Sequence, residues 1–193
     1  MRVAVVGGGC VGLAVAAALA ADPDRPGSSA IDVTLYERDE LGSGATGQAA
    51  GICYDAFAGP TDAAVAARAL ERYRDWGLLT PRPYVWLARD GTDARAVRDQ
   101  AAEMRTLGLA VATLAPEALG ERYPAIDTDG VAAAAVATAA GTVEPERVVR
   151  CLATRAATAG ATIETGTPAT LAGPTTVETP DGVASFDAVV VAA

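Results

Sequence analysis

The sequence RVAVVGGGCVGLAVAAALA, residues 2–20, decides the fold of this chain. Residues 2–6 are mostly apolar without alternation, which is typical of a buried strand in a parallel sheet. GGGCVG follows at once, and residues 10–21 then form a run of helical length that is apolar all round, as in a buried helix. The order of these segments predicts a strand, a glycine-rich turn and a helix.

The glycine-rich turn carries the G-x-G-x-x-G spacing at Gly7, Gly9 and Gly12. Gly7 allows a tight turn out of the strand, Gly9 lets the backbone approach a pyrophosphate, and Gly12 lets the helix pack closely. The helix begins at Cys10 and Val11, where free N–H groups and a partial positive charge favour phosphate. The motif therefore predicts a dinucleotide site.

A second strand is predicted over residues 31–36, and it ends at Glu37. A carboxylate at this position can accept the two ribose hydroxyls of a dinucleotide. Glu37 lies 25 residues after Gly12, whereas the usual spacing is about 20, and a surface loop over residues 22–29 accounts for the excess. The negative charge disfavours NADP but leaves NAD and FAD open. Arg38 can neutralise a phosphate, or it is a solvated surface residue.

Composition excludes several classes of function. The net charge of −9 argues against a nucleic-acid partner, and the absence of His removes His-based metal sites and catalytic triads. Three cysteines without a C-x-x-C pair indicate neither a disulfide framework nor a zinc site, so we expect no metal. No apolar run free of Gly and charge is long enough to span a membrane. Residues 1–20 mimic a secretory signal, but glycines interrupt them, and a cytoplasmic protein is expected.

The rest of the chain predicts alternating elements. Thr61 or Asp62 is a candidate cap for a helix to about residue 76, with Val65, Ala69, Leu70 and Tyr73 at helical spacing. Thr92 is a candidate cap for a helix ending near Gly108. An extended loop is expected over residues 40–51, and residues 131–138 are ambiguous between strand and helix. The other predictions are strands at 84–88, 109–114, 161–164, 169–171, 177–179 and 186–191, a helical turn at 116–119, and a helix from Pro145 to Gly160 with Val148, Val149, Leu152 and Ala156 on one face.

Two stretches carry a family resemblance. VAVVGGGCVGLAVAAALA (3–20) and VTLYERDELGSGATGQAAG (33–51) resemble the start of the FAD-dependent D-amino-acid oxidase, glycine oxidase and sarcosine oxidase family. ERYPAI (121–126), residues 141–170 and FDAVVVAA (186–193) are similar to later segments of that family in the same order. The resemblance implies that the cofactor is FAD.

The resemblance also assigns cofactor-binding positions beyond the first motif. Ala169 stands where a Val usually offers backbone contacts to adenine, and Ala192 ends the strand that the family places near the pyrophosphate. The remaining positions are Ser43, Ala45 and Thr46 on the phosphate side, and Gln48, Ala49, Ala50 and Gly51 beside the flavin.

The expected fold is α/β. A Rossmann-like FAD/NAD(P)-binding domain, with a parallel sheet and flanking helices, would comprise residues 1–80 and 141–193. Part of an inserted α+β substrate domain would comprise residues 81–140. Family members continue beyond this length, so we expect the chain to stop before the fold is complete and to lack turnover alone. A separate partner chain that supplies the missing half would reconcile an enzyme with a partial chain.

The resemblance implies oxidation of a C–N bond in an amine or amino-acid substrate. A hydride would pass from the carbon beside the amine to the flavin, and oxygen or another electron acceptor would reoxidise the cofactor. No catalytic residue is assigned. Two alternatives stay open: an NAD-dependent dehydrogenase, which predicts more regular βαβ alternation after Glu37, and a non-catalytic truncated nucleotide-binding module.

Overall fold

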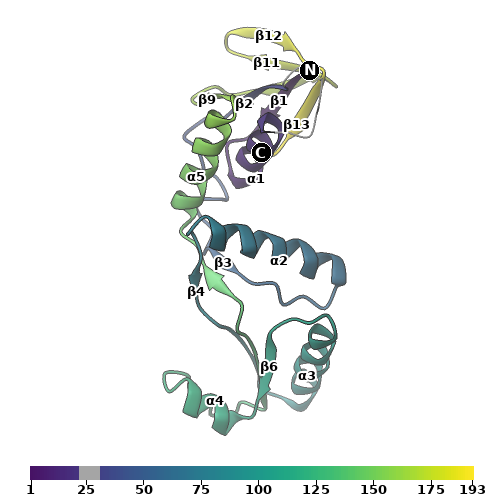
Figure 1. Cartoon of the computed structure of the whole chain (residues 1–193), viewed down its shortest axis with the longest axis vertical. Coiled ribbons are helices and arrows are strands. Elements are labelled where there is room, and N and C mark those ends of the chain that lie inside the picture. The colour runs from purple at the N-terminus through teal and green to yellow at the C-terminus, as the bar shows by residue number, and fades with distance from the viewer. Residues whose placement is uncertain (22–30) are drawn as a thin grey trace. The chain divides into compact units, whose positions relative to one another are not determined.

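The computed structural model describes residues 1–21 and 31–193, so the predicted surface loop over residues 22–29 lies outside the described residues (Figure 1). The described chain forms two compact units, Met1–Ala50 with Glu144–Ala193, and Gly51–Val143. Residues 51–80 pack within the second unit, although the sequence assigns them to the cofactor domain. The functional division of the chain stays a prediction.

A parallel sheet forms the centre of the first unit (Figure 1). Its strand order is β13-β1-β2-β9, and every pairing is parallel. Val3 of β1 pairs with Val33 on one side and with Ala188 on the other. The four strands are β1 (Arg2–Val6), β2 (Asp32–Tyr36), β9 (Thr162–Glu164) and β13 (Ala188–Val191).

Both faces of this sheet are covered. On one face lies an antiparallel sheet of β10 (Thr170–Gly173), β11 (Thr176–Thr179) and β12 (Gly182–Ser185). Ala4 packs there with Val177 of β11 and with Phe186, which follows β12. Val3 and Val5 point to the opposite face, because side chains alternate along a strand. There α1 (Cys10–Ala20) contacts β1 and β2. Burial from two sides explains why β1 is apolar without alternation.

The two helices of this unit differ in how well the sequence predicts their burial. In α5 (Pro145–Thr158), the predicted face of Val148, Val149, Leu152 and Ala156 is buried. In α1 the prediction of burial all round is wrong, because the sheet and α5 cover one side only and Val11 is 61% exposed. The last strand is likewise less buried than expected, because β13 is an edge strand of the described sheet.

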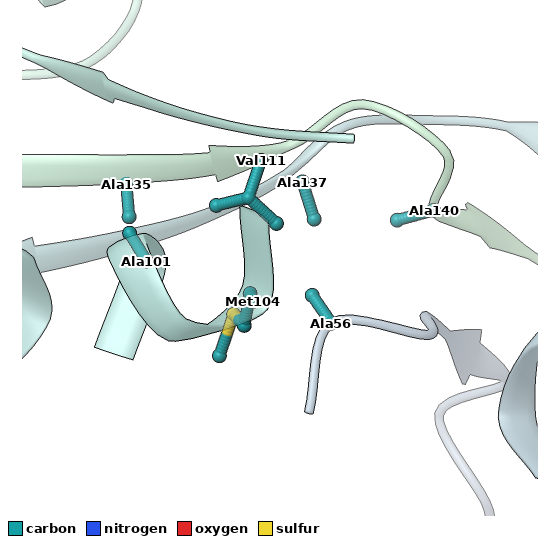
Figure 2. Packing of buried hydrophobic residues seen from close by; sticks show 7 residues of the cluster. All are labelled: Ala56, Ala101, Met104, Val111, Ala135, Ala137 and Ala140. Atoms are coloured by element: carbon teal, nitrogen blue, oxygen red, sulfur yellow. The ribbon is translucent and has the colours of Figure 1, made fainter. Parts of the chain in front are cut away.

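The second unit is built on an antiparallel sheet of order β5-β7-β6, formed by β5 (Tyr84–Ala88), β6 (Val111–Leu114) and β7 (Ala133–Ala137). The ambiguous segment therefore contains a strand, β7, and all five of its residues are buried. α3 (Gly91–Thr106) packs against this sheet, and Figure 2 shows Ala101 pointing toward Ala135. Met104 and Val111 are the large side chains in a buried cluster that is otherwise alanine.

The remaining elements correct two details of the sequence prediction, the caps of two helices. Gly59 precedes α2 (Pro60–Asp75) as its N-cap, so neither Thr61 nor Asp62 caps this helix. Pro60 takes that first turn because its missing N–H needs no partner there. Asp90 rather than Thr92 caps α3, through a hydrogen bond accepted from Asp93 N. The other elements of the unit are α4 (Pro116–Arg122) and the short strands β3 (Ile52–Cys53), β4 (Thr80–Pro81) and β8 (Gly141–Thr142).

The predicted face of α2 is only partly buried. Leu70 is buried, whereas Val65, at helical spacing in the same apolar set, is 67% exposed.

Candidate functional site

A cavity of about 450 Å³ lies in the first unit where the parallel strands end. β1 has β2 on one side and β13 on the other, so the chain order reverses beside β1. Open parallel sheets bind ligands outside the carboxyl ends of their strands at such a switch point. The cavity is lined by Val6, Gly7 and Gly9, by Glu37 and Arg38, by residues 42–46 and 168–170, and by Ala192 and Ala193.

The glycine turn is required by close backbone contacts. Gly7 has φ +115°, and a Cβ there would lie 2.6 Å from the Ala192 backbone. A Cβ on Gly12 would lie 1.9 Å from the Gly7 carbonyl oxygen. Neither position accommodates a side chain, so the turn holds the start of α1 directly against the end of β1.

The N-terminus of α1 is joined to a second loop. Gly9 is its N-cap and offers no side chain, and Cys10 N donates to Thr46 Oγ1 at 3.1 Å. A Cβ on Gly9 would lie 3.0 Å from the same hydroxyl oxygen. The first turn of a helix presents N–H groups and a partial positive charge. This corner of the cavity therefore suits an anionic group.

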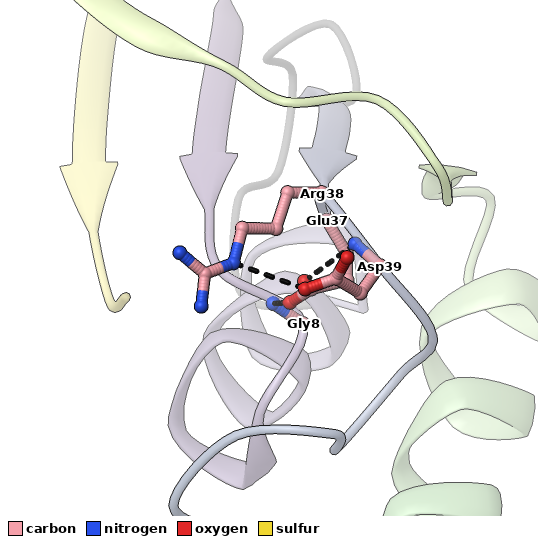
Figure 3. Close-up of polar contacts among 4 residues, drawn as sticks. All are labelled: Gly8, Glu37, Arg38 and Asp39. Carbon is pink, nitrogen blue, oxygen red and sulfur yellow. Dashed lines mark hydrogen bonds and ion pairs between the residues drawn. The ribbon is translucent and has the colours of Figure 1, made fainter.

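Glu37 is held in place through both carboxylate oxygens. Gly8 N donates to Oε2 at 2.7 Å and Asp39 N donates to Oε1 at 3.0 Å (Figure 3). Each carboxylate oxygen has a further lone pair, so the group can still accept hydroxyl hydrogens. The two backbone contacts fix an acceptor at the edge of the cavity.

Arg38 lines the cavity next to this carboxylate. Its Nε donates to Asp39 Oδ2 at 3.1 Å, and the two side chains are 75% and 61% exposed. Such an exposed ion pair contributes little to stability. The ion pair matters instead because Arg38 places a positive charge beside Glu37.

The segment after Glu37 is a series of turns and not an extended loop. Gly42 N donates to the Gly8 carbonyl at 3.0 Å, Gly47 N to the Gly42 carbonyl at 2.8 Å, and Ala49 N to the Thr46 carbonyl at 3.2 Å. The first of these hydrogen bonds ties the segment to the glycine turn, and the other two close turns within the segment. They bring Ser43, Ala45 and Thr46 to the cavity.

The structure brings together most of the residues predicted from the sequence. Three of them, Cys10, Val11 and Gly12, lie in α1 without lining the cavity. Gln48, Ala49 and Ala50 are exposed at the end of the turns and do not line it, and Gly51 belongs to the second unit. The predicted residues that do line it are Gly7, Gly9, Glu37, Arg38, Ser43, Ala45, Thr46, Ala169 and Ala192.

Sequence reasoning missed Gly8 and Asp39, whose backbone N–H groups hold Glu37. Neither contact depends on a side chain, so the sequence carries only an indirect signal, the extra glycine in the middle of GGG. A Cβ on Gly8 would lie 2.8 Å from Glu37 Cβ, which explains that glycine. Pro168 and Thr170 flank the predicted Ala169 and complete that wall.

Two groups, one in each unit, have shifted acidities. Burial raises the pKa of the Tyr36 hydroxyl, Glu164 raises it further and Arg2 lowers it. Burial also raises the pKa of the Cys53 thiol. Cys53 is therefore protonated at neutral pH, which does not suit a nucleophile.

Residues 1–21 and 31–193 contain no group of three or more His, Cys, Asp or Glu side chains that could hold a metal ion. Within the same ranges, no helix combines the length and apolar character needed to cross a bilayer.

Comparison with known proteins connects this geometry to a family. The model of the DAO family, described as FAD dependent oxidoreductase, matches residues 2–193. No curated protein sequence matches the chain significantly. Among solved structures, L-proline dehydrogenase from P. horikoshii superposes with a TM-score of 0.87 at 23% identity, over 99% of this chain and 52% of that one.

Two other solved structures extend the comparison. Glycine oxidase from Geobacillus kaustophilus gives a TM-score of 0.80 at 25% identity, over 100% of this chain and 55% of that one. L-amino acid deaminase from Proteus myxofaciens gives 0.80 at 20% identity, over 98% and 44%. The chain thus spans about half the length of the solved structures that it matches.

Proposed function

This chain belongs to the DAO family of FAD-dependent oxidoreductases, and we propose that its cavity holds the adenosine diphosphate half of FAD. One observation carries the proposal. Glu37 is fixed by Gly8 N and Asp39 N at the edge of a cavity that also contains the start of α1. A hydroxyl acceptor and an anion site then share one cavity, as a ribose linked to a pyrophosphate requires.

The residues present fit this group. A volume of about 450 Å³ lies within the usual range of about 300–1,000 Å³ for ligand pockets. We assign the ribose hydroxyls to Glu37, the pyrophosphate to the α1 N-terminus with Ser43 and Thr46, and the adenine to the wall containing Ala169. No positively charged side chain other than Arg38 is needed, because the helix terminus supplies N–H donors and partial charge.

We further propose that the substrate is an amino acid or a secondary amine, oxidised at a C–N bond by hydride transfer. FAD, when bound, supplies the hydride acceptor. The names of three matched structures support the substrate class, since they are a glycine oxidase, an L-proline dehydrogenase and an L-amino acid deaminase. A fourth is an L-α-glycerophosphate oxidase, which makes an alcohol substrate the alternative to be tested.

The electron acceptor, oxygen or another compound, belongs to the same proposal, as does a partner chain that supplies further flavin and substrate contacts. We also propose a cytoplasmic location. Its support is that Cys10, Cys53 and Cys151 are all free thiols, which suits a reducing compartment.

The visible absorption spectrum of the purified protein, recorded during titration with FAD, tests the cofactor site. We expect saturable uptake of FAD, and an affinity lowered about tenfold or more in Glu37→Gln, because a charged acceptor of two N–H groups is lost. Glu40→Gln is the matched control, since Glu40 is exposed on the same segment. Absence of FAD uptake by the wild type, together with a melting shift caused by NAD, would contradict the assignment.

The substrate proposal is tested by anaerobic reduction of the FAD-loaded protein together with the partner chain, because the chain alone is expected to lack turnover. Glycine, L-proline and a secondary amine are compared with glycerol 3-phosphate. Bleaching of the flavin spectrum by an amine and not by glycerol 3-phosphate supports oxidation at a C–N bond, and the reverse pattern contradicts it.

A further inference from the structure

Glu37, Arg38 and Asp39 follow one another at the end of β2, ahead of Glu40, and they act on the cavity differently. Glu37 and Arg38 line it, whereas Asp39 does not. Asp39 nevertheless contacts both neighbours, since its N–H donates to Glu37 Oε1 at 3.0 Å and its carboxylate accepts from Arg38 Nε at 3.1 Å (Figure 3). The backbone and the side chain of Asp39 therefore have separable roles.

The charge at this edge decides which riboses can enter. Arg38 is the one cationic side chain among the described residues that line the cavity. A dinucleotide with a phosphate on its ribose 2′-oxygen needs a nearby Arg to accommodate that charge. The Asp39 carboxylate already accepts from the Arg38 guanidinium, which engages that cation in an ion pair.

We propose that Asp39 is a specificity-determining residue, which by pairing with Arg38 excludes dinucleotides that carry a 2′-phosphate. The inference rests on the proposed function, because it takes Glu37 as the ribose acceptor. FAD carries no phosphate at this position and is unaffected. Phosphorylated nicotinamide dinucleotides are kept from competing for the same site.

The pair of ligands that isolates this effect is 2′,5′-ADP and 5′-ADP, which differ only in the 2′-phosphate. Their dissociation constants are measured by calorimetry at low, fixed ionic strength, because exposed charges are screened by salt. The variants are Asp39→Asn, Arg38→Gln and the double variant. Asp39→Asn keeps the backbone N–H that holds Glu37. Asp32→Asn is the control for charge alone, since Asp32 is an exposed residue of β2 that pairs with Arg2 at 3.8 Å.

We expect Asp39→Asn to lower the ratio of the two constants, 2′,5′-ADP over 5′-ADP, by about fivefold, the upper range for an exposed ion pair. In the Arg38→Gln background, Asp39→Asn should leave the ratio unchanged, because no Arg38 guanidinium remains to be released from the ion pair. Asp32→Asn should also leave it unchanged.

Two results would overturn the inference while leaving the cofactor site intact: a ratio in Asp39→Asn within twofold of wild type, or an equal fall in the Arg38→Gln background. A rise of the ratio would likewise overturn it, by showing that Asp39 aims Arg38 at phosphate. Failure of the wild type to bind 5′-ADP at all would instead overturn the proposed cofactor site.

Discussion

The two units bury their central strands by different means. In the first unit β1 places valines on one face and Ala4 on the other, and it leads into a turn that only glycine fits. In the second unit β7 is equally buried, but four of its five residues are alanine. A turn in which an added Cβ would lie within 3 Å of backbone atoms accepts only glycine, and glycines at fixed spacing are visible in the sequence. A core of small side chains is compatible with many sequences and leaves no such pattern.

The largest effect should come from Gly12→Ala in the first unit. The new Cβ would meet the Gly7 carbonyl oxygen at 1.9 Å, and we expect a loss of about 3 kcal/mol or more of unfolding free energy. FAD uptake should fall with it. Chemical denaturation gives the free energy. Gly44→Ala, which lines the cavity, is the control for the unfolding free energy alone, because nothing lies within 4 Å of its Cβ position. Equal losses in both variants would show that the Gly12 contact is not limiting.

A smaller effect is expected from Ala135→Leu in the second unit. Ala135 is buried in the same cluster as Ala101 and Met104, so added methylenes should cost about 1–3 kcal/mol of unfolding free energy. Ala69→Leu, on an exposed part of α2, should change it by about 0.5 kcal/mol at most. If Ala135→Leu is as well tolerated as this control, the alanine core is looser than the structure indicates.

A gain is expected from Gly91→Ala at the start of α3. Its Cβ would meet nothing within 4 Å, and its φ is not left-handed. The substitution should therefore stabilise by about 0.4–1 kcal/mol, by restricting the unfolded chain. Gly108→Ala is the matched control, equally uncrowded but with φ +78°, and it should destabilise. Melting temperatures of the two variants should move in opposite directions, and movement in the same direction would contradict the assigned backbone.

The smallest expected difference concerns alkaline pH. Burial raises the pKa of Cys53 in the second unit and that of Tyr36 in the first above their ordinary values. The folded state then holds these protons longer than the unfolded state, so stability is full below the unfolded pKa and falls as pH rises through the folded pKa. Stability measured from pH 8 to 11 should fall less in Cys53→Ala and in Tyr36→Phe. A variant with the wild-type pH profile would exclude its residue as a source of the loss.

The sequence predicts the elements around the glycine turn of the first unit better than the alanine-rich strand of the second. The β1, α1 and β2 segments and Glu37 are predictable because the backbone there restricts residue choice. Their elements are confirmed, and the cofactor-binding role of Glu37 stays a prediction. The strand β7 is not predictable, because alanine favours helix by intrinsic propensity and packing in the sheet overrides that preference. The predicted caps of α2 and α3 lie two or three residues after the observed ones, since several capping residues occur together there. The two hydrogen bonds that hold Glu37 come from the backbone N–H groups of Gly8 and Asp39. Every residue except proline has such a group, so the sequence does not reveal these contacts.

The pairing of β1 with β13 has a consequence for the order of folding. Val3 aligns with Val33 on one side and with Ala188 on the other, so β1 acquires one neighbour early in synthesis and the other only late. The second unit lies between these partners in the chain and can fold first, because a domain generally folds as a unit during synthesis. The late, long-range closure brings Ala192 against Gly7. A nascent chain should therefore expose the glycine turn until this strand arrives, and cofactor capture should be among the last events of folding.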